Sequence, residues 1–228
     1  MTSKQTSKAV AALTAQLLEH LERGGGLHRY ANYHAEIERE RGSLEIGQIN
    51  GSVLQSEDAD EKAKGSPFDT GLAFDKLLNE VIKATDKTEP LRLVDYAFVR
   101  NDAGWQQRRL LQTIEAHDAL EEARRGLDKQ LVALLAEQCR AATAEVSLER
   151  RRTRPDVELV LVSKAGKASR PELPDGLRNL YQEYEGFYAD RGFRMIELVA
   201  TMDARRLKRV DVDLSYGLPL DSATATER

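Results

Sequence analysis

The chain has 228 residues, of which 41% are hydrophobic and 32% are charged. This composition is typical of a globular protein and excludes disorder along the whole chain, and the length suffices for one large domain or two small ones. The 38 acidic and 34 basic residues give a net charge of −4, which disfavours a dedicated nucleic-acid-binding protein and favours a basic protein partner.

The longest apolar runs, such as VELVLV at 157–162, are far shorter than a membrane span. The N-terminus has no apolar core of the signal-peptide kind, so we expect a cytoplasmic protein without a membrane partner. The single cysteine, Cys139, excludes an intrachain disulfide and a cysteine-based zinc site, and we interpret it as a small hydrophobic residue.

The N-terminal region predicts a helix followed by strands. An apolar stripe from Val10 to Leu21 forms one helical face, which the glycines 24–26 close. Apolar and polar residues then alternate over 31–38, as in a strand with one wet face. The alternation of apolar and polar residues shifts by one position beside Gly47, which indicates a β-bulge. Asn50-Gly51 is typical of a hairpin turn. We therefore predict a three-stranded meander, followed by an exposed loop over 55–66.

A second helix over 69–84 follows from apolar residues at intervals of three and four, and two strands come after it around the turn 101–104. Beyond them we predict a long helix over 116–150, with a break or kink at Gly126. At its end stands a basic cluster of Arg150, Arg151, Arg152 and Arg154. Arginines suit a solvated helix C-terminus, and a phosphate-binding patch is the alternative.

The last block predicts a helix from about residue 175, a stop at Gly192 and two strands around a polar turn at Asp203 and Ala204, after a loop over 164–174. This is again a helix and two strands, an αββ unit. We predict an α+β fold of three αββ units with largely antiparallel sheets covered by helices. The expected domains are 1–116, a helical connector 117–154, a C-terminal lobe 155–219 and a frayed tail 220–228.

No sequence motif for catalysis is present. Gly166-Lys167 lacks the other residues that a phosphate-binding loop requires, since Leu161 and Ala168 stand at two essential positions. His34, Glu36 and Glu38 would share one strand face and are the candidate ligands for a divalent metal, but polar residues on a wet strand face are the simpler interpretation. We therefore expect no catalytic residue, no metal, no cofactor and no enzyme activity.

The last strand carries the most suggestive polar residues. If Val212, Leu214 and Tyr216 face the core, then Asp211 and Asp213 face outward by the period of two, together with Arg209 and Ser215. Two outward carboxylates serve as a solubilising edge, a catalytic or cation-binding pair, or a surface for basic residues.

This block also resembles a known family. The helix LRNLYQEYEGFY, the turn ADRG, the strand FRMIELVAT, the turn MDARRL and the strand VDVDLSYG, within 173–217, resemble the C-terminal part of the YezG-like immunity proteins. Those proteins are small, acidic and α+β, and they bind and neutralise nuclease toxins delivered by neighbouring bacteria.

The resemblance implies a non-enzymatic immunity protein or antitoxin that binds a basic protein toxin. Its implied contact residues are Asp211, Asp213, Arg209 and Tyr216. The alternative is a structural or assembly protein that forms a homo-oligomer through the long helix, and the third hypothesis is a metal-dependent enzyme without a recognised motif.

Overall fold

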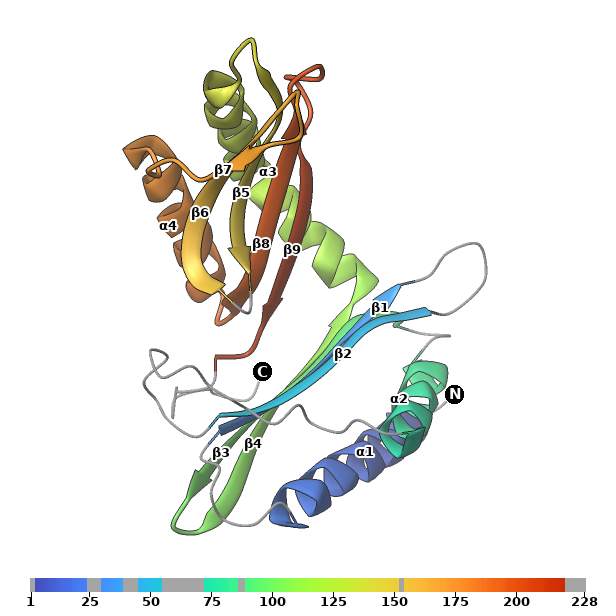
Figure 1. Ribbon diagram of the computed structural model, residues 1–228. Coiled ribbons are helices and arrows are strands. Elements are labelled where there is room, and N and C mark those ends of the chain that lie inside the picture. Colours follow the sequence, from blue (N-terminus) through green and yellow to red (C-terminus); the bar gives the residue numbers. More distant parts are fainter. Residues whose placement is uncertain are drawn as a thin grey trace. The chain divides into compact units, whose positions relative to one another are not determined.

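The computed structural model describes residues 3–23, 30–38, 45–54, 72–85, 89–151 and 154–219 (Figure 1). The chain divides into two compact units. Unit 1 comprises Met1–Ala119 together with Leu218–Arg228, and unit 2 comprises Leu120–Gly217. Residues 120–154, predicted as part of a helical connector, therefore belong to unit 2.

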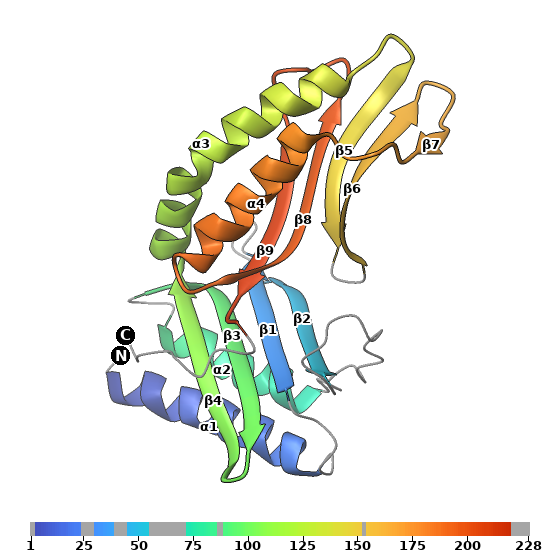
Figure 2. The ribbon, with the colours of Figure 1, turned by 90° about the vertical axis from the view of Figure 1, so that its left-hand side faces the viewer.

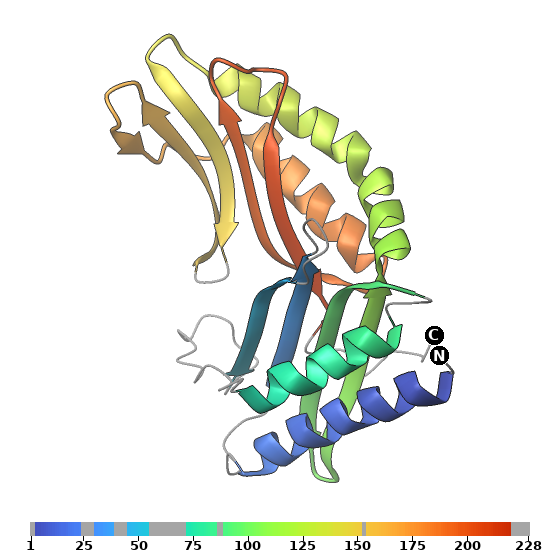
Figure 3. The same cartoon turned by 90° about the vertical axis from the view of Figure 1, so that its right-hand side faces the viewer.

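Unit 1 contains a four-stranded antiparallel sheet, sheet A, with two helices on one face (Figures 1 and 3). Its strand order is β2-β1-β3-β4. The elements are α1 (Ser3–Arg23), β1 (Tyr30–Glu38), β2 (Glu45–Leu54), α2 (Leu72–Thr85), β3 (Leu91–Asn101) and β4 (Gly104–Thr113).

The apolar stripes of both helices form the core of unit 1 with one face of the sheet. Leu13 and Leu17 of α1 and Leu78 and Ile82 of α2 are fully buried, which confirms both predicted helices. From the sheet, alternate residues of β1 and β3 enter the same core, as the period of two requires. These are Ala31, Tyr33, Ala35 and Ile37, and Val94, Tyr96 and Phe98.

Unit 2 contains a five-stranded antiparallel sheet, sheet B, with strand order β7-β6-β5-β8-β9. Helices α3 and α4 lie on one of its faces (Figure 2). The elements are α3 (Ile114–Gln138), which starts within unit 1, β5 (Thr143–Arg151), β6 (Arg154–Ser163), β7 (Ala168–Ser169), α4 (Asp175–Ala189), β8 (Arg194–Asp203) and β9 (Asp211–Gly217).

The two units repeat one topology. Each runs helix, strand, strand, helix, strand, strand, apart from the two-residue strand β7. The strand orders also correspond, because β2-β1-β3-β4 in sheet A matches β6-β5-β8-β9 in sheet B. The α+β prediction is confirmed, and the described part of the chain contains four αββ units where the sequence predicted three.

The missed unit is α3-β5-β6, and β5 is the strand that the sequence analysis missed. α3 ends at Gln138, so the predicted helix over 116–150 is wrong beyond that residue. The helix also continues through Gly126 without the predicted break. Val146 and Leu148 are fully buried at a spacing of two, and such short apolar runs do not distinguish a strand from a helix. Of the basic cluster, Arg150 and Arg151 end β5 and Arg154 begins β6, whereas Arg152 lies outside the described residues. Arg150 donates a hydrogen bond to the carbonyl of Ile196.

The predicted meander is also partly wrong. Asn50 and Gly51 lie inside β2, where they pair with His34 and Tyr33, so no hairpin forms there. The predicted bulge is confirmed, because the register shifts opposite Gly47. The glycines 24–26, the loop 55–66 and the tail after residue 220 lie outside the described residues. None of the described helices has the length and apolarity that a membrane crossing requires.

Candidate functional site

Sheet B has one face that neither α3 nor α4 covers, within the described part of unit 2 (Figure 2). We call it the open face. Its side chains follow from the alternation of the strands and from the residues that pair directly across them. They are Glu145, Ser147, Glu149 and Arg151 of β5, Arg154, Glu158, Val160 and Val162 of β6, Glu197, Val199, Thr201 and Asp203 of β8, and Asp211, Asp213 and Ser215 of β9.

The open face is strongly acidic. Seven of the fifteen residues named above are Glu or Asp, and the cations among them, Arg151 and Arg154, pair directly across β5 and β6. Glu158 forms ion pairs with Arg154, at 3.9 Å, and with Arg170, at 3.0 Å. Glu145 and Asp203 pair directly across neighbouring strands, an arrangement in which like charges destabilise the sheet. Arg205 offsets this repulsion, because it donates hydrogen bonds to the Asp203 carboxylate from Nε at 3.1 Å and from Nη2 at 3.0 Å.

Arg151 organises the centre of the open face. Its Nε donates a hydrogen bond to Glu149 Oε2 at 2.9 Å, and its Nη1 lies 4.0 Å from Glu197 Oε1. Burial alone raises the pKa of Glu149, but hydrogen bonds from Arg151 and Ser147 outweigh burial and hold that pKa below its usual value. The hydrogen bond with Glu149 raises the pKa of Arg151. The centre is therefore locally neutralised.

The predicted contact residues Asp211 and Asp213 lie exposed on the open face. The side chain of Asp211 is 76% exposed, and Arg209 donates hydrogen bonds to its Oδ1 from Nε at 3.1 Å and Nη2 at 3.0 Å. Asp213 contributes to the raised pKa of Arg151. The structure thus brings Asp211, Asp213 and Arg209 together at one edge of sheet B, since β9 is an edge strand.

Tyr216, predicted as a contact residue, is wrongly assigned. Its side chain is 4% exposed and belongs to the opposite face of β9. Its ring stacks on Tyr188 of α4, with centroids 4.9 Å apart, and lies 5.3 Å from the ring of Phe193. Aromatic packing of this kind holds α4 against the sheet, so Tyr216 is a core residue of unit 2 and not a surface for a partner.

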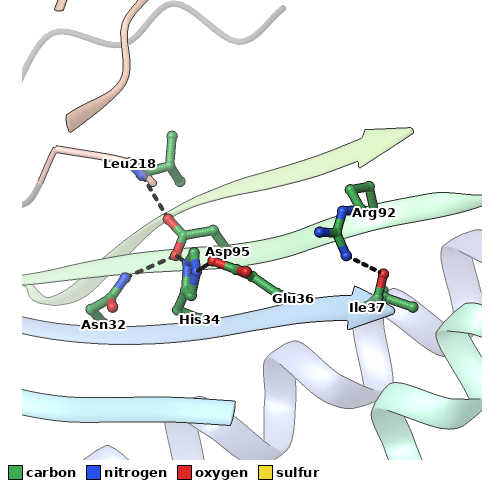
Figure 4. A network of polar contacts seen from close by, with 7 residues as sticks. All are labelled: Asn32, His34, Glu36, Ile37, Arg92, Asp95 and Leu218. Atoms are coloured by element: carbon green, nitrogen blue, oxygen red, sulfur yellow. Dashed lines mark hydrogen bonds and ion pairs between the residues drawn. The ribbon is translucent and has the colours of Figure 1, made fainter. Parts of the chain in front are cut away.

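The second polar cluster lies in unit 1 and is buried (Figure 4). His34 and Asp95 pair directly across β1 and β3, and both side chains are fully buried. His34 Nδ1 lies 2.9 Å from Asp95 Oδ1, and its Nε2 lies 3.1 Å from Glu36 Oε1. The imidazole is therefore held between two carboxylates.

Two further donors converge on Asp95. Asn32 donates from Nδ2 to Oδ1 at 3.0 Å, and the backbone N–H of Leu218 donates to Oδ2 at 2.7 Å (Figure 4). Beside them, Arg92 Nη1 donates to the carbonyl of Ile37 at 2.8 Å. The carboxylate of Asp95 thus joins two neighbouring strands to the segment that follows β9.

Electrostatics favour a charged imidazole here. Burial lowers the pKa of His34, but the hydrogen bonds with Asp95 and Glu36 outweigh burial and raise it. Burial raises the pKa of Glu36, and the hydrogen bond with His34 outweighs that effect and lowers it. An imidazolium donates to both carboxylates at once, whereas neutral histidine has one N–H only.

These contacts correct the prediction of a wet strand face at His34 and Glu36. The side chain of His34 has no exposure to solvent, and that of Glu36 is 21% exposed. The side chain of Glu38 lies outside the described residues. Sequence reasoning missed Asp95, although an aspartate inside the apolar run LRLVDYAFVR is a signal for a buried, paired carboxylate.

The cluster is an ion network that links β1 and β3 around a fully buried imidazole. Among the residues that the structure describes, no group of three or more His, Cys, Asp or Glu side chains is arranged to hold a metal ion. Cys139 is half-buried, and burial raises the pKa of its thiol.

Comparison with known proteins gave no match to a family model, to a curated protein or to a solved structure.

Proposed function

We propose that this chain is a non-enzymatic binding protein whose open face receives a basic protein partner. The observation that supports the proposal is the array of carboxylates on one face of sheet B that neither α3 nor α4 covers. Electrostatic complementarity of this kind accelerates association and selects the partner by charge.

The partner class follows from the distribution of charge along β8 and β9. Asp213 is exposed, Glu197 is partly exposed, and Asp211 forms a single exposed ion pair with Arg209. An exposed ion pair contributes little free energy, so a lysine or arginine of a partner replaces Arg209 at a small cost in free energy. Val199, half-buried between them, adds apolar contact area.

With the C-terminal resemblance described above, these features support an immunity protein or antitoxin that neutralises a basic, nuclease-type toxin. Oligomerisation through the long helix gains no support, because α3 exposes no large hydrophobic side chain.

The test measures the affinity for the protein product of the neighbouring gene by titration calorimetry. The double variant Asp211→Lys/Asp213→Lys replaces two attractions by two repulsions. Desolvated charge pairs couple by about 1.5 kcal/mol or more each, so we expect an affinity loss of at least about 100-fold. A co-expression assay should show loss of protection in the same variant.

The matched control is Glu172→Lys/Glu183→Lys, which makes the same change in net charge at exposed positions outside the open face. We expect this control to bind almost as well as the wild type, and both variants to keep the wild-type melting temperature. Equal loss in both variants would show a general effect of net charge and would remove the open face from the interface.

A further inference from the structure

Three turns of unit 2 lie together at one end of sheet B. β5 begins opposite the end of β6 and opposite the end of β8, so the α3–β5, β6–β7 and β8–β9 turns share that end (Figure 1). Backbone hydrogen bonds of 2.9 Å join them. Lys164 N–H donates to the carbonyl of Ala142, and Ala204 N–H donates to the carbonyl of Ala144.

These turns carry a concentration of positive charge, which we call the basic end. Its seven cations are all exposed, and they are Arg140, Lys164, Lys167, Arg205, Arg206, Lys208 and Arg209. Two of them are neutralised locally. Arg205 forms two hydrogen bonds with Asp203, at 3.1 and 3.0 Å, and Arg209 pairs with Asp211. The other five cations form no ion pair with any carboxylate that the structure describes. They are Arg140, Lys164, Lys167, Arg206 and Lys208.

The tip of the β8–β9 turn adds an apolar residue. Leu207 is 44% exposed and is the one large hydrophobic side chain exposed among the described residues. It stands between Arg206 and Lys208. The turn is held by its own backbone, since Arg206 N–H donates to the carbonyl of Asp203 at 2.8 Å and Arg209 N–H donates to that of Arg206 at 3.0 Å.

We propose that the basic end docks on the anionic surface of a lipid bilayer. Basic residues at a membrane surface are attracted by anionic headgroups, and an apolar side chain between them enters the boundary of the acyl chains. A bilayer is an extended surface that meets all three turns at once. A nucleic-acid backbone attracts the same cations but offers no comparable environment for Leu207.

The net charge of −4, from which we expected no nucleic-acid partner, averages over two surfaces of opposite sign. We expected no membrane partner because the apolar runs are shorter than a membrane span, and docking on a bilayer surface requires no span. The acidic open face and the basic end adjoin, and the ion pairs Asp203–Arg205 and Asp211–Arg209 lie where they meet. The other five cations and Leu207 are not residues of the open face, so the vesicle test does not depend on the proposed function.

The test is co-sedimentation of the full chain with vesicles of phosphatidylcholine and phosphatidylglycerol, compared with vesicles of phosphatidylcholine alone. We expect binding to the anionic vesicles only, and weaker binding as salt screens the charges. Lys208→Gln should reduce the vesicle affinity about fivefold, because each basic residue near an anionic surface contributes a factor of that size. Leu207→Ser should reduce it about tenfold.

The matched control is Lys129→Gln, which removes one exposed cation from α3, away from the basic end. It should bind as the wild type does. Absence of binding to the anionic vesicles would overturn the proposal, as would equal losses in Lys208→Gln and Lys129→Gln. Binding to a duplex oligonucleotide that Leu207→Ser leaves unchanged, without binding to vesicles, would assign the basic end to nucleic-acid phosphates instead and would also overturn it.

Discussion

His34 Nδ1 lies 2.9 Å from Asp95 Oδ1, and neither side chain is exposed to solvent. The pair joins β1 to β3, and the backbone of Leu218 binds the second oxygen of the same carboxylate. A charge that is buried with its partners stabilises the fold only while every partner is present. The stability of unit 1 should therefore depend on each member of this network.

Replacing Asp95 with alanine should destabilise the protein by about 3–5 kcal/mol, because a buried imidazolium then loses its partner. Asn32 and the Leu218 N–H lose an acceptor at the same time. Urea unfolding measures the change. The control Asp102→Ala removes an exposed carboxylate from the β3–β4 turn and should change the free energy of unfolding by less than about 0.5 kcal/mol.

The His34 network should make stability depend on pH in a defined direction. Because the pKa of His34 is raised in the folded state, its contribution is complete below the ordinary value of 6.5 and is lost as the pH rises through the raised pKa. The melting temperature of the wild type should therefore fall towards that of His34→Gln as the pH rises from acidic to alkaline values. A constant difference between the two proteins would contradict a charged imidazole.

Leu78 tests the packing of α2 on sheet A. Its side chain is fully buried in the core of unit 1, so Leu78→Asp should bury an unpaired carboxylate and cost about 4 kcal/mol or more. Glu80→Asp, at an exposed position of the same helix, is the control. Circular dichroism during thermal unfolding measures both. A melting temperature of Leu78→Asp equal to that of the control would show that this face of α2 does not pack on the sheet.

The contact between α3 and α4 rests partly on a partly buried hydrogen bond. Tyr184 donates from its hydroxyl to Asp128 Oδ1 at 2.7 Å, and Arg124 Nε donates to the same oxygen at 3.1 Å. Tyr184→Phe should cost about 1.5–3 kcal/mol, as for hydrogen bonds to charged groups. A double-mutant cycle with Asp128→Asn separates this bond from packing, and strictly additive effects would show that the two side chains are not coupled.

Two glycines of the α4 region should respond oppositely to alanine. Gly192 follows α4 with φ of +77°, which side chains rarely adopt, so Gly192→Ala should destabilise by about 1 kcal/mol. Gly186 is helical, and a Cβ atom there has nothing within 4 Å, so Gly186→Ala should stabilise by about 0.5–1 kcal/mol. Thermal unfolding of both variants measures the difference, and a shift of the same sign in both would refute it.

Local patterns were sufficient for part of the fold. The helices α1, α2 and α4 and the hairpins β3–β4 and β8–β9 follow from apolar periodicity and turn residues, which act between neighbours in the chain. The outward side of Asp211 and Asp213 follows in the same way, because strand alternation fixes it once the core face is known. The sequence by itself thus determined the α+β class and the outward orientation of Asp211 and Asp213 at the edge of the open face.

Only the tertiary structure decided what depends on pairing between distant segments. Val146 and Leu148 form a strand because β6 and β8 flank them, and this pairing creates the fourth αββ unit and the repeated topology. His34 is buried because Asp95, distant in sequence, supplies its partner. The open face likewise combines carboxylates from four strands. Periodicity assigns a residue to a face, but the neighbours that neutralise or bury it come from other strands, and their register is a property of the assembled sheet.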